Sequence, residues 1–260
     1  MTTLPYPCPR PLALFLYFLT TCVCAPSLFA QIDRGTIDYR ESRQFELWDG
    51  ASDDMKKRIQ EAQARGDFDR MGRLSFTAEE MSYQQLPKEI SPNASGGMRN
   101  WYMRDNENPD VYHLSFADSI VTDRRRIMDK SFIMSDAWVV PEWEIPENQQ
   151  LNSAYLLPSK AAFAVSPEGD TLTAYFTPTI PLGIGPRGYG GLPGAIVYLK
   201  VEKDNSYTEY VMTTMQPNAP DLEVAKPVDG EVVDRDKFEK MKAKREEMMA
   251  RRRRSWERGE

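Results

Sequence analysis

The stretch GPRGYGGLPGAIVYL, residues 185–199, decides how the rest of the chain is interpreted. Its first ten residues hold five glycines and two prolines, and an apolar run follows them. Glycine admits backbone angles that other residues avoid and proline fixes φ, so together they favour a long, shaped turn. A short apolar run bounded by such a turn is typical of a buried strand. We therefore predict a turn that delivers residues 195–199 into a core strand.

A nucleotide site is the rival interpretation of this turn, because Gly183–Gly188 has the spacing G-x-G-x-x-G. That motif holds a pyrophosphate where a helix begins at the glycines. Gly190, Gly191 and Pro193 follow instead and oppose a helix. The sequence also lacks the Gly-Lys-Ser/Thr of a phosphate-binding loop and the Gly-x-Ser-x-Gly of a nucleophile elbow. We therefore expect a structural turn and no nucleotide cofactor.

Short segments of alternating apolar and polar residues, separated by turn residues, dominate the chain. Two hairpins stand out, Lys160–Ser166 with Thr171–Thr177 and Ala195–Glu202 with Tyr207–Met215. Further strands are expected at Thr36–Arg40, Leu74–Phe76, Val111–Phe116, Ser119–Met128, Ser131–Asp136 and Trp138–Ile145. The predicted fold class is mainly β: an antiparallel curved sheet, a sandwich or a partial barrel.

Two helices are expected outside this β region. Ser52 or Asp53 is a suitable N-cap for a helix that runs to about Arg65 and stops at Gly66. Near the other end, Asp234 is a suitable N-cap for a helix rich in Lys, Glu, Arg, Ala and Met. This second helix has a thin apolar stripe, so we expect it to dock at its start and fray at its end.

The first thirty residues have the pattern of a secretory signal peptide. Arg10 precedes an apolar run from Leu12 to about Ala25, and cleavage is expected near Ala30. An uncleaved anchor and a lipid-modified Cys22 stay open as alternatives. The predicted organisation is a signal peptide over 1–30, a mainly β domain over 31–230 and a basic helix or tail over 231–260.

All three cysteines, Cys8, Cys22 and Cys24, lie in this leader. A mature chain without cysteine has no disulfides, thiol catalysis or thiolate metal site, so its core must hold it together. No later segment is apolar enough to be predicted as a membrane span. We therefore expect a periplasmic or secreted protein.

The charge of the chain is divided between an acidic body and a basic end. Residues 234–260 carry 11 Lys and Arg against 7 Asp and Glu, whereas residues 1–233 carry 22 against 32. The candidate partner-binding residues are Arg251, Arg252, Arg253, Arg254 and Trp256. An envelope or outer-membrane protein, a peptide or a lipid is the expected partner, and nucleic acid is not, because the protein is expected to be exported. A solvated end without a partner is the alternative.

Catalytic candidates are few. His113 is the only histidine, which rules out a His-rich zinc site and favours a structural role in a strand. Glu142 and Glu144 flank Trp143 in a way that glycoside chemistry could use. In a chain with 39 acidic residues such a pair arises by chance, and a solvated face explains it as well. No catalytic, cofactor-binding or metal-binding residue is predicted.

The segment AYFTPTIPLGIGPRGYGGLPGAIVYLKVE, residues 174–202, resembles the signature of the GLPGLI family, exported proteins of Bacteroidetes-type bacteria. Gly35, Ile37, Tyr39 and Trp143 agree with the same family. The residues that match its motif are Tyr175, Phe176, Thr177, Ile180, Pro181, Gly185, Pro186, Gly191, Leu192, Pro193, Gly194 and Ile196.

Two departures from the family pattern stand out: Ala195 replaces a leucine, and the segment SAYLLPSKA, residues 153–161, lacks the family's cysteine. The resemblance implies an exported, mainly β protein and implies no reaction. The function expected from the sequence is a non-catalytic binding or accessory protein of the envelope. A carboxylate-dependent hydrolase and a structural envelope component are the alternatives.

Overall fold

The computed structural model describes residues 32–47, 50–89, 103, 106–107, 109–220 and 222–257. The predicted leader, its cysteines and its cleavage site lie outside the described residues, as do the side chains of residues 252–257. Among the helices of the described part, none is long and apolar enough to cross a membrane.

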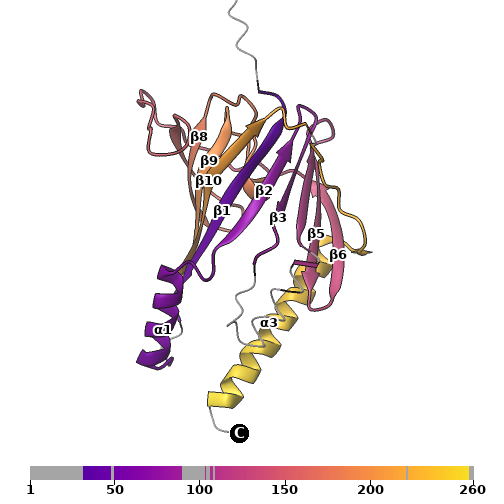
Figure 1. Cartoon of the computed structure of the whole chain (residues 1–260). Helices are drawn as coiled ribbons and strands as arrows, with labels where there is room; N and C mark the ends of the chain where they lie inside the picture. Colours follow the sequence, from indigo (N-terminus) through magenta and orange to yellow (C-terminus); the bar gives the residue numbers. More distant parts are fainter. Residues whose placement is uncertain are drawn as a thin grey trace, which may run out of the picture. The chain divides into compact units, whose positions relative to one another are not determined.

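Eleven strands of the described chain join into a single sheet (Figure 1). The elements in chain order are β1 (Gly35–Phe45), α1 (Asp53–Ala64), β2 (Arg70–Phe76), β3 (Glu80–Gln85), β4 (Val111–Ser115), β5 (Ile120–Ile127), β6 (Lys130–Ala137), β7 (Lys160–Val165), β8 (Thr171–Thr177), η1 (Pro186–Gly188), β9 (Ala195–Lys203), β10 (Ser206–Pro217), β11 (Glu231–Val232) and α3 (Arg235–Glu257).

The strand order across the sheet is β11-β6-β5-β4-β3-β2-β1-β10-β9-β8-β7. Strands β1 to β6 form one run of neighbours and β7 to β10 form another, and the two runs meet where β1 pairs with β10. Every neighbouring pair is antiparallel except β11 and β6, which run parallel. The sheet is therefore mixed, and it does not close, since β11 and β7 stand at opposite ends.

The prediction of a mainly β protein with one early and one C-terminal helix is confirmed. The finer expectation of a purely antiparallel sheet is corrected by β11. The chain after β10 leads to Glu231–Val232, which pairs with Phe132 and Ile133 of β6 in parallel. Both predicted hairpins are present, as β7 with β8 and as β9 with β10.

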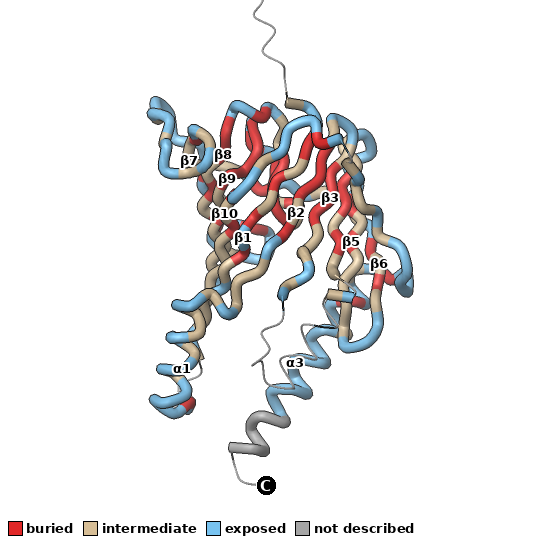
Figure 2. The backbone as a smooth tube through the Cα atoms, in the orientation of Figure 1, coloured by how far each residue is buried: buried red, intermediate tan, exposed pale blue. Residues whose placement is uncertain are grey.

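The core lies on one face of this sheet. The register places Ile37 of β1 opposite Leu74 of β2, and Leu74 opposite Tyr83 of β3. Ile184 and Leu192, from the turn before β9, belong to the same hydrophobic cluster. Figure 2 shows buried residues concentrated in the middle strands. Burial of this apolar surface is the main favourable term in folding, and no disulfide joins the described residues because they contain no cysteine.

Both helices begin at the N-caps that the sequence predicts. Ser52 Oγ accepts a hydrogen bond from the Met55 amide at 3.3 Å, and Gly66, at φ 73°, follows the end of α1. Asp234 Oδ1 accepts a bond from the Lys237 amide at 2.7 Å at the start of α3. Each cap satisfies an amide that lacks a partner in the first turn of a helix.

The segment Trp138–Ile145, predicted as a strand, is not one. Its single bridge joins Glu144 to Phe163 of β7. Pro141 lies inside the segment and has no amide hydrogen to donate to a ladder, so continuous pairing is prevented. The prediction was wrong because it relied on the apolar residues of this segment and did not take account of its proline.

The outer edge of β7 is covered by the chain that precedes it. Glu144 and Phe163 exchange backbone hydrogen bonds of 2.7 and 2.9 Å. The Gln149 side-chain amide donates to Ala161 O at 2.9 Å and accepts from Ala161 N at 2.8 Å, as a neighbouring strand would. An open edge invites pairing with another chain. These contacts occupy the edge of β7 at Ala161 and Phe163.

Candidate functional site

The glycine-rich loop, residues 183–194, lies against the core face of the sheet and leads into β9. Its ends are tied together by hydrogen bonds of 2.9 Å from Gly191 N to Gly183 O and from Ile196 N to Ile184 O. Ile196, like the other residues at the start of β9, is fully buried. The prediction of a shaped turn that feeds a core strand is confirmed.

Two tryptophans hold the outer part of this loop. Trp138 Nε1 donates to Gly188 O at 3.0 Å, and Trp143 Nε1 donates to Gly190 O at 2.9 Å. Both come from the extended segment before β7. That segment therefore fixes the loop through side chains rather than through strand pairing, and a buried loop backbone needs such partners.

Arg187 stands in the middle of the loop with φ 50° and ψ 27°, in the left-handed region. Gly188 follows at φ 84°. A Cβ atom at Gly188 would overlap the ring and hydroxyl of Tyr112, so a side chain there meets both backbone strain and an occupied space. The single 3₁₀ turn Pro186–Gly188 places Arg187 beside charged and phenolic groups of the sheet.

Glu41 of β1 is the carboxylate that faces this arginine. Arg187 Nη2 lies 3.6 Å from Glu41 Oε2, which also accepts from Gln85 Nε2 at 2.9 Å. The Tyr83 hydroxyl donates to Glu41 Oε1 in a short hydrogen bond. Tyr83 reaches β1 across β2 because Gly72 lies between them, and a Cβ at Gly72 would overlap the phenol. We call these five residues the Arg187 cluster.

The tyrosines around Arg187 are held in their protonated form. Burial raises the pKa of Tyr83 well above 10, and the Glu41 carboxylate adds to that shift. Burial also raises the pKa of Tyr210, against the opposing effect of Arg187. Burial raises the pKa of Tyr189 to about 12. These phenols therefore keep their protons near neutral pH and do not act as bases.

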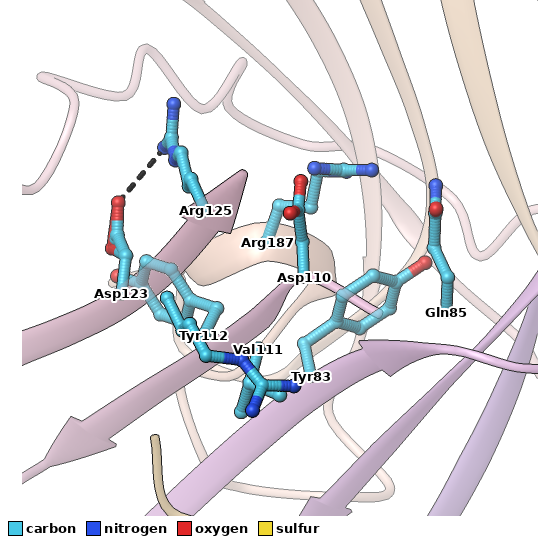
Figure 3. A pocket seen from close by; sticks show the side chains of 9 residues that line it. Tyr83, Gln85, Asp110, Val111, Tyr112, Asp123, Arg125 and Arg187 are labelled. Carbon is cyan, nitrogen blue, oxygen red and sulfur yellow. Dashed lines mark ion pairs between the residues drawn. The ribbon is translucent and has the colours of Figure 1, made fainter. Parts of the chain in front are cut away.

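A small polar pocket of about 20 Å³ adjoins the Arg187 cluster. Figure 3 shows the Asp110 carboxyl beside the Arg187 side chain, with Arg125 paired to Asp123 on the other side. The pocket is lined by Tyr83, Gln85, Asp110, Val111, Tyr112, Asp123, Arg124, Arg125 and Arg187. Its volume suits one water molecule and excludes an organic substrate.

Asp123 is the most buried charge of this region, with 2% of its surface exposed. Its Oδ2 lies 3.0 Å from Arg125 Nη2 and 3.3 Å from Arg235 Nη2. Its Oδ1 accepts no hydrogen bond from the residues that the structure describes. One carboxylate thus serves two guanidinium groups, and through Arg235 it ties β5 to the start of α3.

A larger basic groove of about 330 Å³ lies between β5 and α3. It shares Asp110 and Arg125 with the small pocket. Its lining is Asp110, Arg125, Arg126, Ile127, Phe238, Lys242, Arg245, Glu246 and Met249. Four of these side chains are cationic and two are acidic, so the groove favours anions.

Helix α3 is anchored at its start and uncovered afterwards. Phe238 is 2% exposed and packs edge-on against Phe132 of β6, with ring centroids 5.9 Å apart. Arg235 Nη2 also lies 2.6 Å from Asp136 Oδ2. Met241 is half-buried, and every residue from 242 to 251 is exposed. The prediction that this helix docks at its start is confirmed.

The other predicted residues fall in separate places. His113 is 8% exposed in β4, and its Nε2 lies at hydrogen-bond distance, 2.9 Å, from Glu80 Oε2, so it has a structural place in the sheet. Glu142 and Glu144 are exposed and line neither of the two pockets. Arg251 is exposed, and the side chains of Arg252, Arg253, Arg254 and Trp256 lie outside the described ones.

The Arg187 cluster was not predicted from the sequence. Arg187 was visible as the single charge in the glycine-rich loop, but nothing nearby in the sequence identifies Glu41 as its partner. Gly72 was a weak signal, since a glycine inside a strand often marks a close approach by another group.

Comparisons with known proteins place the chain near a family without an assigned activity. Residues 137–198 match a family described as "Protein of unknown function (Porph_ging)". The matched part contains both tryptophan anchors and the whole glycine-rich loop. No curated protein matches the chain.

Solved structures show distant likeness. A structure of PNGF-II in space group P21 is 13% identical, with a TM-score of 0.44, over 80% of this chain and 33% of that one. The C2 form is 10% identical, with a TM-score of 0.43, over 77% and 31%. An uncharacterized conserved protein from Thermus thermophilus is 10% identical, with a TM-score of 0.31, over 76% and 90%. The chain spans about a third of the length of the PNGF-II chains.

Proposed function

We propose that this chain is an exported, non-catalytic binding protein of the cell envelope, of the GLPGLI type, and that α3 is its docking arm. The leader pattern of residues 1–30 supports export, since a charged start, a short apolar run and a small residue near the cut are its usual parts. The absence of cysteine after residue 24 means that the exported chain needs no oxidative folding step.

The observation that carries this proposal is the uncovered length of α3. The helix has 23 residues, and from residue 242 to residue 251 all are exposed. An isolated helix of this kind is marginal in water, because most helical stability in proteins comes from packing against a partner. Ion pairs within the helix, such as Arg251 with Glu247 at 2.6 Å, contribute only a few tenths of a kcal/mol. A protein partner supplies the missing contact surface.

The chemistry of the arm selects an acidic partner. Its end carries Arg251 to Arg254 followed by Trp256, whereas the body of the chain is acidic. Clustered cations speed association with an acidic surface and suppress association with basic ones. The expected partner is an envelope protein with an acidic face.

The test is co-purification from the native envelope. The wild-type protein is compared with a variant in which Arg251–Arg254 are all replaced by Gln. A matched control replaces four basic residues of α1 and its C-cap, Lys56, Lys57, Arg58 and Arg65, by Gln. We expect one acidic membrane protein to be retained by the wild type and the α1 control and lost with the α3 variant.

Two results would contradict the docking arm. Equal recovery of the partner by all three proteins would show that α3 does not hold it. Retention by anionic lipid vesicles, with no protein recovered, would replace the protein partner by a membrane surface.

A further inference from the structure

The basic groove between β5 and α3 is separate from the arginines at the end of the arm. We propose that this groove binds a small organic oxyanion, a carboxylate or phosphate monoester, that carries a short apolar chain. The proposal stands on the lining of the groove and does not require the docking arm.

The charge of the groove is not balanced by its own carboxylates. Arg125 shares the carboxylate of Asp123 with Arg235 and also interacts with Asp110 of the groove, so two carboxyl groups, Asp110 and Glu246, stand against four cations in the lining. Lys242 pairs at 3.4 Å with Glu239 of its own helix, an exposed pair of the kind that contributes little. Arg245 makes no ion pair with any residue that the structure describes. The groove therefore presents donors suited to an added oxyanion.

The hydrogen-bond donors of the groove limit the chemical class of ligand that it can bind. A guanidinium group offers parallel N–H donors that match the two oxygens of a carboxylate or phosphate, and such charge-assisted bonds are stronger than neutral ones. Arg125 comes from the sheet and Arg245 from the helix, so a bound oxyanion would bridge β5 and α3.

The apolar residues of the lining are the reason why we expect the ligand to carry a short apolar chain. Phe238 and Ile127 lie at the anchored part of α3 and the end of β5, and Met249, 53% exposed, lies further along the helix. The volume of about 330 Å³ is at the small end of the range for ligand pockets. It suits a charged head with a short chain.

The test measures binding of three probes to the purified protein by isothermal titration calorimetry. Octyl phosphate and octanoate carry the proposed head and chain, and octanol carries the chain alone. We expect both anions to bind and octanol to bind at least about tenfold more weakly, since it makes no charge-assisted bonds. The tighter of the two anions identifies phosphate or carboxylate as the natural head group.

Variants on α3 separate this groove from general attraction to a basic helix. Lys242→Glu with Arg245→Glu changes the lining, and Lys240→Glu with Lys244→Glu makes the same charge change at exposed positions outside it. We expect a loss of about tenfold or more for the first pair and about twofold or less for the second. Circular dichroism verifies that both variants keep the helix.

The proposal is overturned if the wild type binds neither anion, if octanol binds as tightly, or if both double variants lose affinity equally. The variant in which Arg251–Arg254 are replaced by Gln should keep its affinity for octyl phosphate. The experiments therefore distinguish a failure of anion binding in the groove from a failure of partner docking by α3.

Discussion

Arg187 and Arg251 carry the same side chain in opposite surroundings. Arg187 is 34% exposed, sits at a left-handed backbone position and faces the buried Glu41. Arg251 is 71% exposed and pairs only with Glu247 one turn away, among the residues that the structure describes. The first is fixed by residues from several strands and a loop, while the second depends on its own helix.

This difference separates a region that stabilises the fold from the region that we propose to bind a partner. The Arg187 cluster satisfies its charges internally and leaves a pocket the size of one water molecule. Helix α3 is exposed from residue 242 to residue 251 and borders a groove of about 330 Å³. Substitutions in the first region should therefore alter folding, and substitutions in the second should alter binding.

The largest effect is expected from Gly188→Ala, because the new Cβ overlaps Tyr112 at a positive φ. The overlap and the strain together should lower the free energy of unfolding by about 4 kcal/mol. Gly169→Ala is the control, since Gly169 has φ 90° and nothing within 4 Å of its Cβ position. It should lose about 1 kcal/mol in urea titrations. Equal losses would show that the loop does not pack against β4 as described.

Phe238→Ala should detach α3 from the sheet. Removal of a buried phenylalanine costs about 3 kcal/mol, and here the loss falls on the small cluster of Phe238 with Phe132 and Met134. Hydrogen exchange should show faster exchange in α3 and unchanged protection in β1 and β10. Met248→Ala, at an exposed position, should change neither the exchange rates in α3 nor the protection of β1 and β10. Faster exchange throughout the sheet would mean that the helix is part of the main core.

Asp110→Asn should alter the pH dependence of stability. Burial raises the pKa of Asp110 above the ordinary 3.8, against the opposing effect of Arg187 and Arg125. The folded protein then binds this proton more readily than the unfolded chain does. The contribution of this group is fully present below 3.8 and is lost as the pH rises through the raised value.

The measurement is urea unfolding of both proteins between about pH 3 and about pH 7, a range that brackets the ordinary aspartate value. The stability of Asp110→Asn relative to the wild type should increase with pH above that value. A relative stability that falls over the same range would show that the arginines, rather than burial, control Asp110.

The smallest effect on folding is expected from replacing Arg251–Arg254 by Gln. Exposed charges contribute little, so the free energy of unfolding should change by less than about 0.5 kcal/mol, as measured by thermal and urea denaturation. A loss above about 2 kcal/mol would show that these arginines stabilise the fold.

Local patterns in the sequence predicted much of this fold, whereas the contacts between residues far apart in the chain could not be predicted. The caps Ser52 and Asp234 and both hairpins follow from residues close in sequence. The parallel pair of β11 with β6, and the meeting of Arg187 with Glu41, join residues far apart in the chain, which periodicity does not detect. Trp138–Ile145 failed as a strand because Pro141 interrupts it and its tryptophans bind the loop instead.

The most direct test of docking by α3 is amide hydrogen exchange. It compares the protein alone with the protein bound to its partner in a solubilised envelope fraction. We expect the amides of the glycine-rich loop to be protected in both states, and those of α3 after Met241 to exchange quickly alone and slowly in the complex. Slower exchange in the loop on complex formation, with exchange in α3 unchanged, would place the binding surface at the Arg187 cluster and contradict docking by α3.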